Sequence, residues 1–379
     1  MSAPKSRTLT LQDVADLARG CAFLGSGGGG DPHHAFMEIE AALAAGGVIE
    51  LMELEALADD AFVAPCGWIG APTISLEKLP SGREALQGLR RLEEIAGRRV
   101  DAVLPVEIGG SNGLAALLLA LRAGLPVVDC DGMGRAFPES QMVIFNIRGQ
   151  KATPAILTDD KSNCVVLQTV DNTTEERLAR AVSVVLGGNC HLIEYAASGR
   201  ELKANALSGT ISDALCIGRS IRLARESGRD PFPALFAALQ SSRQFDQAGV
   251  LFDGKIVDLQ RETRGGFSVG RAVIEAFGGG QRLEVEFKNE NLIARLDGSV
   301  RALVPDIISI LDRETAETIV TECLKYGQRV KVVAASAPAA LRSASALAVL
   351  GPAAFGLPGP YRCVAELNEW QPMAEQSRG

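Results

Sequence analysis

The chain has 379 residues, of which 47% are hydrophobic and 22% are charged, and its formal net charge is −8. This length is typical of two domains and allows a sizeable core to be buried. The acidic balance and the lack of a basic run argue against nucleic acid as a partner, because binding phosphates requires a positive surface.

The N-terminal part alternates helical and strand-like segments. A helix is predicted to begin at Thr10, where Asp13 completes a capping box, and a second to run from Pro32 to about residue 45. Further helices are predicted over residues 81–96 and 112–123, and short buried strands over residues 48–51, 62–69, 102–106, 127–128 and 191–195. Such alternation predicts a layered α/β domain.

The pattern changes near Phe245. Short β-rich runs separated by turns cover residues 249–258, 266–275, 283–287, 292–296, 307–311 and 330–334. This spacing predicts a small β-barrel or sandwich. We therefore place a boundary near residue 243, giving an α/β domain over residues 1–243 and a β domain over residues 244–379.

A glycine-rich loop, residues 25–31, precedes the second predicted helix. Glycine lets a backbone approach a ligand closely, and the N–H groups at a helix N-terminus favour an anion or a polarised carbonyl. No Gly-Lys-Ser/Thr follows, so the loop is not a phosphate-binding P-loop, and a helix stands where a dinucleotide fingerprint requires a strand. The alternative is a tightly packed turn.

Glu107 follows a buried strand, and Gly109, Gly110 and Ser111 lead from it into the next helix. Ligands of open α/β sheets gather at the carboxyl ends of strands. Glu107 is therefore a candidate site residue, and the alternative is an ordinary turn with a solvated carboxylate.

Asp129 and Asp131 are separated by one residue at the end of another strand, so both could face one site. Paired carboxylates repel, which can leave one as a general acid or base, and they could equally bind a divalent metal. Arg135 could neutralise one of them or bind an anionic substrate. The alternative is an Asp-rich turn, with Cys130 a buried thiol.

The three histidines do not form a zinc motif. His33 and His34 are adjacent at a helix start, where neighbouring side chains diverge, and His191 stands alone in a predicted strand. The eight cysteines are widely spaced without a CxxC pair, and the N-terminus lacks an apolar signal segment. These features predict reduced thiols in a cytoplasmic protein, and the longest apolar run, residues 114–121, is too short to span a membrane.

Taken in order, several motifs resemble the S-methyl-thiohydantoin desulfurase family, formerly a domain of unknown function. They include FLGSGGGGDP, VEIGGSNG, PVVDCDGMGRAFPE, the RGGF and NENL segments, and LVPDIISILD, and the resemblance covers nearly the whole chain. It implies a three-layer α/β/α domain followed by a mainly-β, barrel-like domain, and removal of sulfur from an S-methylated thiohydantoin ring. Cys130 and the His33–His34 pair depart from the family's usual residues.

The resemblance and the residues together define a candidate site for a small cyclic amide or thioamide. The candidate catalytic residues are Asp131, Asp129 and Glu107, and Asp129 and Asp131 are also the candidate ligands of a divalent metal, if one is used. The candidate substrate-binding residues are Ser26, Gly27, Gly28, Gly29, Gly30, Asp31, Gly109, Gly110, Asn112, Arg135, Gly265, Gly266 and Asn291.

Water attacking the ring carbon between the two nitrogens would develop negative charge on a ring atom, which glycine-loop N–H groups could stabilise. Sulfur would leave as a thiol. Two other hypotheses stay open: an accessory subunit of a hydantoinase- or oxoprolinase-type complex, and a phosphate- or nucleotide-binding enzyme. We expect a homo-oligomer, a hydantoinase-type partner protein and no membrane or nucleic acid partner.

Overall fold

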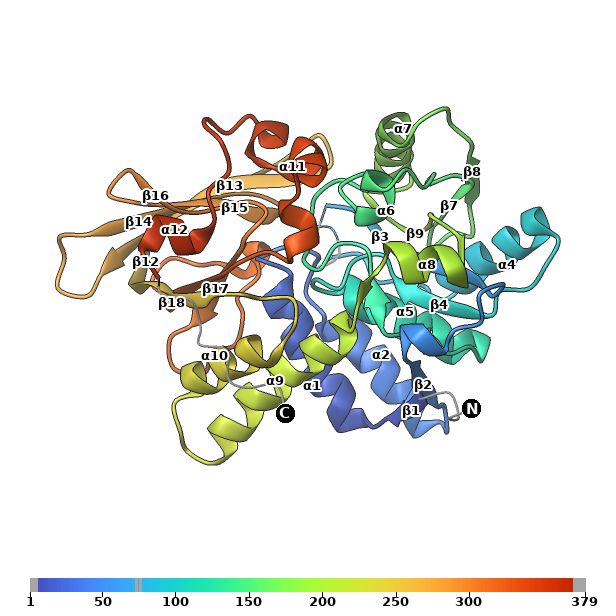
Figure 1. Ribbon diagram of the computed structural model, residues 1–379, viewed down its shortest axis with the longest axis horizontal. Helices are drawn as coiled ribbons and strands as arrows, with labels where there is room; N and C mark the ends of the chain where they lie inside the picture. The colour runs from blue at the N-terminus through green and yellow to red at the C-terminus, as the bar shows by residue number, and fades with distance from the viewer. Residues whose placement is uncertain (1–5, 72–73, 75–76, 371–379) are drawn as a thin grey trace.

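The computed structural model describes residues 6–71, 74 and 77–370. Within them, two large sheets lie side by side, with the α/β part at the right and the mainly-β part at the left of Figure 1. The expected α/β-plus-β fold class is confirmed. Along the chain, the first sheet ends with β10 (Ala197–Ser198) and the second begins with β12 (Ala248–Arg264), while β6 (Cys130–Asp131) and β11 (Leu207–Ser208) form a separate two-stranded sheet. The division near residue 243 stays a prediction.

The first sheet is mixed. Its order is β1-β2-β5-β4-β3-β9-β7-β8, with β10 paired to β3, and β2, β5, β4 and β3 run parallel. The strands are β1 (Ser6–Leu9), β2 (Ile49–Met52), β3 (Phe62–Gly70), β4 (Ala102–Pro105), β5 (Val127–Val128), β7 (Ala155–Thr158), β8 (Cys164–Leu167), β9 (Asn189–Ile193) and β10 (Ala197–Ser198).

Helices cover both faces of this sheet. Side chains alternate along a strand: in β9, Ile193 packs in the cluster of Leu89 from α4, whereas Leu192 packs in that of Ala179 from α7. The helices of this half are α1 (Leu11–Leu24), α2 (His33–Ala44), α4 (Glu84–Ala96), α5 (Asn112–Ala123), α6 (Ile144–Ile147), α7 (Asn172–Val185), α8 (Gly199–Asn205), α9 (Thr210–Glu226) and α10 (Pro231–Ser241), with a short turn of helix, η1 (Leu54–Ala56).

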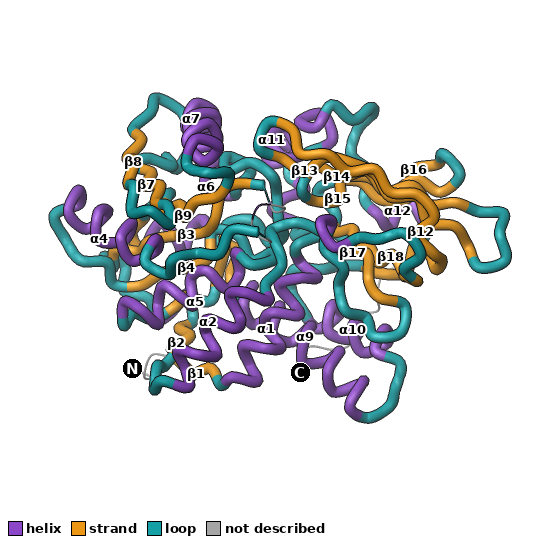
Figure 2. Tube along the Cα trace, turned by 180° about the vertical axis from the view of Figure 1, so that it is seen from behind, coloured by secondary structure: helices purple, strands orange, loops and turns teal. Residues whose placement is uncertain are grey.

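A layer of helices joins the two halves. Figure 2 shows α5, α2, α1, α9 and α10 along one side of the molecule, beneath both sheets. The helices α1 and α9 approach closely because Gly20 and Gly218 stand at their contact. A Cβ on Gly20 would lie 1.8 Å from the carbonyl oxygen of Ala214, so a larger residue there would force the helices apart.

The second sheet is antiparallel and curls into a half-barrel, in the order β16-β15-β14-β13-β12-β18-β17. After β12 its strands are β13 (Phe267–Ala276), β14 (Arg282–Lys288), β15 (Glu290–Leu296), β16 (Ser299–Leu303), β17 (Ile307–Asp312) and β18 (Arg329–Ala335). Short helices complete it: η2 (Thr321–Cys323), η3 (Ala339–Arg342), α11 (Ala344–Leu350), η4 (Pro352–Phe355) and α12 (Val364–Asn368).

Most expected elements form where the pattern predicts them, including all six β-rich runs of the second half. The strand expected at 191–195 instead spans Asn189–Ile193, and β1, β7, β8 and β16 were not predicted. Among the described residues, the helices are too short or too polar to cross a bilayer.

Candidate active site

Glu107 lies just beyond the carboxyl end of β4 and is held from two sides. Its Oε1 accepts a hydrogen bond from Asn112 Nδ2 at 2.8 Å, and its Oε2 accepts one from the backbone N–H of Phe137 at 3.0 Å. Asn112 is fixed in turn, because its Oδ1 accepts the N–H of Trp68 at 2.7 Å. The carboxyl is therefore oriented by residues from three different segments.

Burial governs the protonation of Glu107. The residue is only 3% exposed, and loss of water raises the pKa of its carboxyl to about 8, against hydrogen bonds that act to lower it. The nearby Asp131 charge raises the pKa further, whereas Arg135 lowers it. At neutral pH a large share of Glu107 is consequently protonated.

Glu290 brings a second buried carboxyl from the half-barrel. It begins β15 and is 2% exposed, and its Oε1 accepts the N–H of Gly29 at 3.3 Å. Its Oε2 has no hydrogen-bond partner among the described residues. Burial, followed by the charge of Glu107, raises the pKa of Glu290 well above its usual value.

The glycine loop brings these two carboxyls together. A Cβ on Gly28 would lie 2.2 Å from Glu290 Oε1, and a Cβ on Gly29 would lie 3.1 Å from Glu107 Oε1 and 2.4 Å from the carbonyl oxygen of Gly109. Gly29 also has a φ of +71°, which side-chain-bearing residues rarely adopt. Glycine is thus needed here chiefly because the two acids and the neighbouring loop pack against the backbone.

Arg135 is fully buried behind these acids and holds the two halves together. Its Nη1 donates to the carbonyl oxygens of Asp306 (2.6 Å) and Pro305 (3.2 Å), and its Nη2 donates to that of Asn291 (3.3 Å). Its Nε donates to the carbonyl oxygen of Ala136. Burial lowers the pKa of Arg135 to about 10, so it remains the positive charge opposing the acids.

Asp131 organises the loop around Glu107. Its Oδ2 accepts three backbone N–H groups, from Ile108 (2.8 Å), Gly134 (2.8 Å) and Met133 (3.1 Å). Burial raises the pKa of Asp131 to about 7 against these hydrogen bonds. Its carboxyl fixes the position of the segment that carries Glu107.

Asp129 binds a different element, the N-terminal turn of α9. Its Oδ1 accepts the N–H groups of Ile211 and Ser212, both at 3.0 Å, in the first turn of α9. Capping of this kind stabilises a helix N-terminus by about 0.5–2 kcal/mol.

We expect Asp129→Ala to lower the free energy of unfolding by about 1–2 kcal/mol, because the first turn of α9 loses its acceptor. Turnover should change by less than about threefold, since Asp129 does not line the cavity described next. Urea denaturation monitored by circular dichroism measures the stability, and steady-state kinetics measures the turnover. A loss of activity without a loss of stability would instead place Asp129 in the chemistry.

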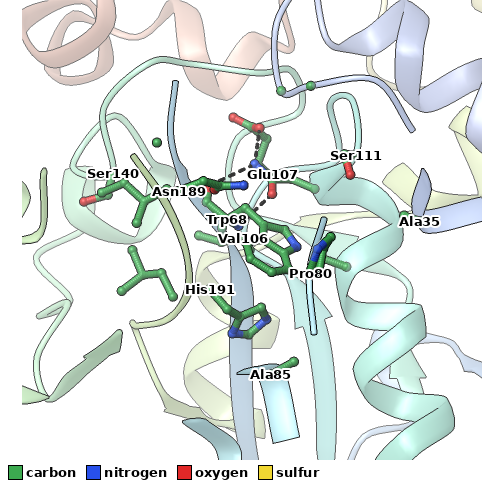
Figure 3. A pocket seen from close by; sticks show the side chains of 18 of the residues that line it. Ala35, Trp68, Pro80, Ala85, Val106, Glu107, Ser111, Ser140, Asn189 and His191 are labelled. Carbon is green, nitrogen blue, oxygen red and sulfur yellow. Dashed lines mark hydrogen bonds between the residues drawn. The ribbon is translucent and has the colours of Figure 1, made fainter. Parts of the chain in front are cut away.

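A small cavity opens beside Glu107 and Glu290. Its volume is about 130 Å³, and its wall includes Gly29, Gly30, Asp31 and Asn112 as well as the two acids. Figure 3 shows Trp68 between Glu107 at the upper end and His191 at the lower end, where Ala85 lies close to the histidine. The long cavity wall also reaches Ser140 and Glu194, beside the buried carboxyls Glu175 and Glu176 of α7.

The sequence-predicted residues divide into two groups. Glu107, Gly29, Gly30, Asp31 and Asn112 line the cavity. The others do not line it: Ser26, Gly27, Gly28, Gly109, Gly110, Asp129, Asp131, Arg135, Gly265, Gly266 and Asn291. The glycine loop, the Glu107 turn and the Asp129–Asp131 segment lie together, since Ser111 donates its N–H to the carbonyl oxygen of Gly29 at 2.9 Å and Ile108 donates its N–H to Asp131.

The half-barrel contributes to the cavity, but through residues adjacent to the predicted Asn291. Asn289 and Glu290 line it, whereas Asn291 donates its N–H to Ser26 and its side-chain amide to Ile308. The Gly265–Gly266 turn lies against Arg180 of α7 rather than in the wall. As for a metal, no group of three or more His, Cys, Asp or Glu side chains within the described residues is placed to hold one.

Glu290, Trp68 and His191 were not selected as site residues from the sequence. A signal for Glu290 was present, because it is an acidic residue between two asparagines amid apolar strand positions. Trp68 gives no such signal, since an aromatic residue in a buried strand is typical of a core.

These features define an α/β-plus-β half-barrel protein with a ring-sized cavity and a buried carboxyl pair where the two halves meet. The family comparison is specific: the S-Me-THD-like N-terminal domain matches residues 12–169 and the S-Me-THD-like C-terminal domain matches residues 170–364. The chain belongs to the S-methyl-thiohydantoin desulfurase family.

The fold is shared with a crystal structure of a protein from Chromobacterium violaceum. The two are 26% identical with a TM-score of 0.77, and the match covers 94% of this chain and 100% of that one. No curated protein matches the chain. The family's C-terminal domain supplies α7, β9 and β10, so both family domains build the first sheet.

Proposed function

We propose that this protein hydrolyses the carbon–sulfur bond of an S-methyl-thiohydantoin or a related five-membered ring. The observation that carries the proposal is the pair of buried carboxyls, Glu107 and Glu290, in contact with the same glycine at the wall of a small cavity. Two acids in one buried site can take different protonation states, as acid–base hydrolysis requires.

The size of the cavity supports a single-ring substrate. An apolar cavity of about 150 Å³ holds one benzene molecule, and pockets for drug-sized ligands are typically about 300 Å³ or more. At about 130 Å³, this cavity suits one small ring with little substitution.

The surroundings suggest different roles for the two acids. Glu107 accepts two hydrogen bonds, which favour its ionised form, so we assign it as the general base that takes a proton from water. The pKa of Glu290 is raised well above its usual value, so its carboxyl is protonated, and its Oε2 has no hydrogen-bond partner among the described residues. We therefore assign Glu290 as the proton donor to the ring nitrogen. Asp131 and Asn112 position Glu107.

The reaction then balances without a redox partner. Water adds to the ring carbon that bears the S-methyl group, Glu107 takes one proton, and Glu290 protonates the ring nitrogen of the former C=N bond. Collapse of the tetrahedral adduct restores a carbonyl and expels sulfur, which leaves as methanethiol with the second water proton. Return of the proton from Glu107 to Glu290 resets the site, and the ring product is a hydantoin.

We expect methanethiol release to rise with pH. A group whose pKa is raised to about 8 is protonated below that pH, so kcat/KM should increase about tenfold per pH unit up to about pH 8 and then level. Thiol-reactive dye detection with S-methyl-thiohydantoin, between pH 5 and 9.5, measures this. A profile flat from pH 5 would remove Glu107 as the base, and no release at any pH would remove the proposed reaction.

A further inference from the structure

His191 is a buried side chain whose hydrogen-bonding capacity is unused within the described residues. It is 1% exposed, and neither Nδ1 nor Nε2 has a hydrogen-bond partner there. Buried polar groups are nearly always paired, and leaving one unpaired costs about 1–3 kcal/mol. An apolar residue would serve a purely structural role at this position better.

The described residues around His191 do not form hydrogen bonds with its imidazole. Trp68 packs edge-on against the imidazole with ring centroids 5.4 Å apart, opposite it in the β3–β9 register. On the other side in the sheet, the hydroxyl of Thr158 donates to the carbonyl oxygen of Glu84. Arg122, which also lines the cavity, is paired with Glu38 at 2.5 Å. The unused nitrogens of His191 are therefore left for whatever enters the cavity.

The imidazole is uncharged under ordinary conditions. Burial, and secondarily the positive charge of Arg122, lowers the pKa of His191 to about 3. A neutral imidazole has one N–H donor and one nitrogen acceptor. The chemical complement of such a group is a neutral substituent that can both donate and accept, such as a hydroxyl or a carboxamide.

We propose that His191 is a specificity-determining residue that binds a small, neutral, hydrogen-bonding substituent on the substrate ring. This inference rests on the proposed function for the placement of the ring at Glu107 and Glu290, with Trp68 separating them from His191 (Figure 3). An alkyl substituent would leave both nitrogens unpaired. A carboxylate would bring acceptors alone, leaving one imidazole nitrogen unpaired, and the guanidinium of Arg122 in the cavity wall is already paired with Glu38.

Binding of product-type rings tests the inference independently of turnover. We expect 5-hydroxymethylhydantoin to bind the wild-type protein about tenfold more tightly than 5-ethylhydantoin, which has a similar size, in isothermal titration calorimetry. In His191→Phe, which keeps an aromatic ring against Trp68, the ratio of the two Kd values should fall to about one. His191→Asn, which retains a donor and an acceptor, should recover part of the preference.

The exposed His33, outside this cavity, provides the matched control: His33→Phe should keep the tenfold ratio. A wild-type ratio near one, tighter binding of 5-carboxymethylhydantoin, or a ratio unchanged in His191→Phe would each overturn the assignment, as would the absence of binding by both rings. If the ratio behaves as expected but no thiohydantoin releases methanethiol, the substituent site stands and the proposed reaction fails.

Discussion

Replacing Glu290 with Gln should lower kcat for methanethiol release by about 10²- to 10⁴-fold, the range that a general acid contributes. Glutamine has the shape of the protonated acid, and its carbonyl oxygen can still accept the N–H of Gly29. It cannot give a proton to the ring nitrogen. The free energy of unfolding should be unchanged within about 1 kcal/mol, because the variant introduces no buried charge.

Steady-state kinetics at pH 8 and urea denaturation measure the two quantities. The matched control is Glu284→Gln on β14, whose carboxylate pairs with Arg271 at 3.0 Å outside the cavity; it should retain full activity. Because residues acting as a unit are not additive, Glu107→Gln/Glu290→Gln should be little slower than either single variant. Activity within threefold of wild type in a folded Glu290→Gln protein would remove Glu290 from the mechanism.

Most of the architecture was predictable because it follows local patterns. The capping box at Thr10, the glycines Gly97 and Gly124 directly after the ends of α4 and α5, and the alternating apolar positions in the half-barrel each mark an element. The strands β7 and β8 were less apparent, since β8 is an edge strand with an alternately exposed pattern and only four residues. The pairing of β9 between β3 and β7 is a long-range choice that local sequence does not encode.

The candidate site was harder to predict because function depends on which side of a loop a residue faces. The glycine loop, Glu107 and the Asp129–Asp131 segment do lie together, but Asp129 and Asp131 direct their carboxylates to backbone N–H groups. Arg135 presents the same difficulty: its sequence context suits an anion site, whereas its guanidinium binds carbonyl oxygens of the other half. His191 becomes notable only through its burial and its unpaired nitrogens, and burial together with an unpaired Oε2 distinguishes Glu290 from the other acids of the half-barrel.

The position of Arg135 links the fold to the proposed chemistry. Its charge acts to lower the pKa of both Glu107 and Glu290, and its hydrogen bonds hold the segment before β17 and the carbonyl of Asn291 in β15. The acid pair therefore depends on the same contact that joins the α/β part to the half-barrel. Displacement of the two halves would separate Gly29 from Glu290 and expose both acids to water.

Arg135→Leu should lower the free energy of unfolding by about 3–5 kcal/mol, because removing one partner from a buried charged network leaves the others uncompensated. The carbonyl oxygens of Asn291, Pro305 and Asp306 would lose this donor, and Glu107 and Glu290 would lose a buried positive charge that acts to lower the pKa of both. In any variant that stays folded, the pKa of Glu107 should rise, moving the rising limb of the rate profile, on the acid side, to higher pH.

Urea denaturation gives the stability change, and the pH dependence of kcat/KM gives the second effect, which a loss of packing alone would not produce. Arg135→Lys separates the effect on stability from the effect on pH dependence. Lysine keeps the charge but not the forked donor geometry, so this variant should be less stable than the wild type while its kcat/KM still levels near pH 8. Arg271→Leu, which removes a partly exposed arginine paired with Glu284, is the control and should cost less than about 1 kcal/mol. An Arg135→Leu protein as stable as the wild type would show that the contact between the halves is held by the packing around it, with the guanidinium contributing little.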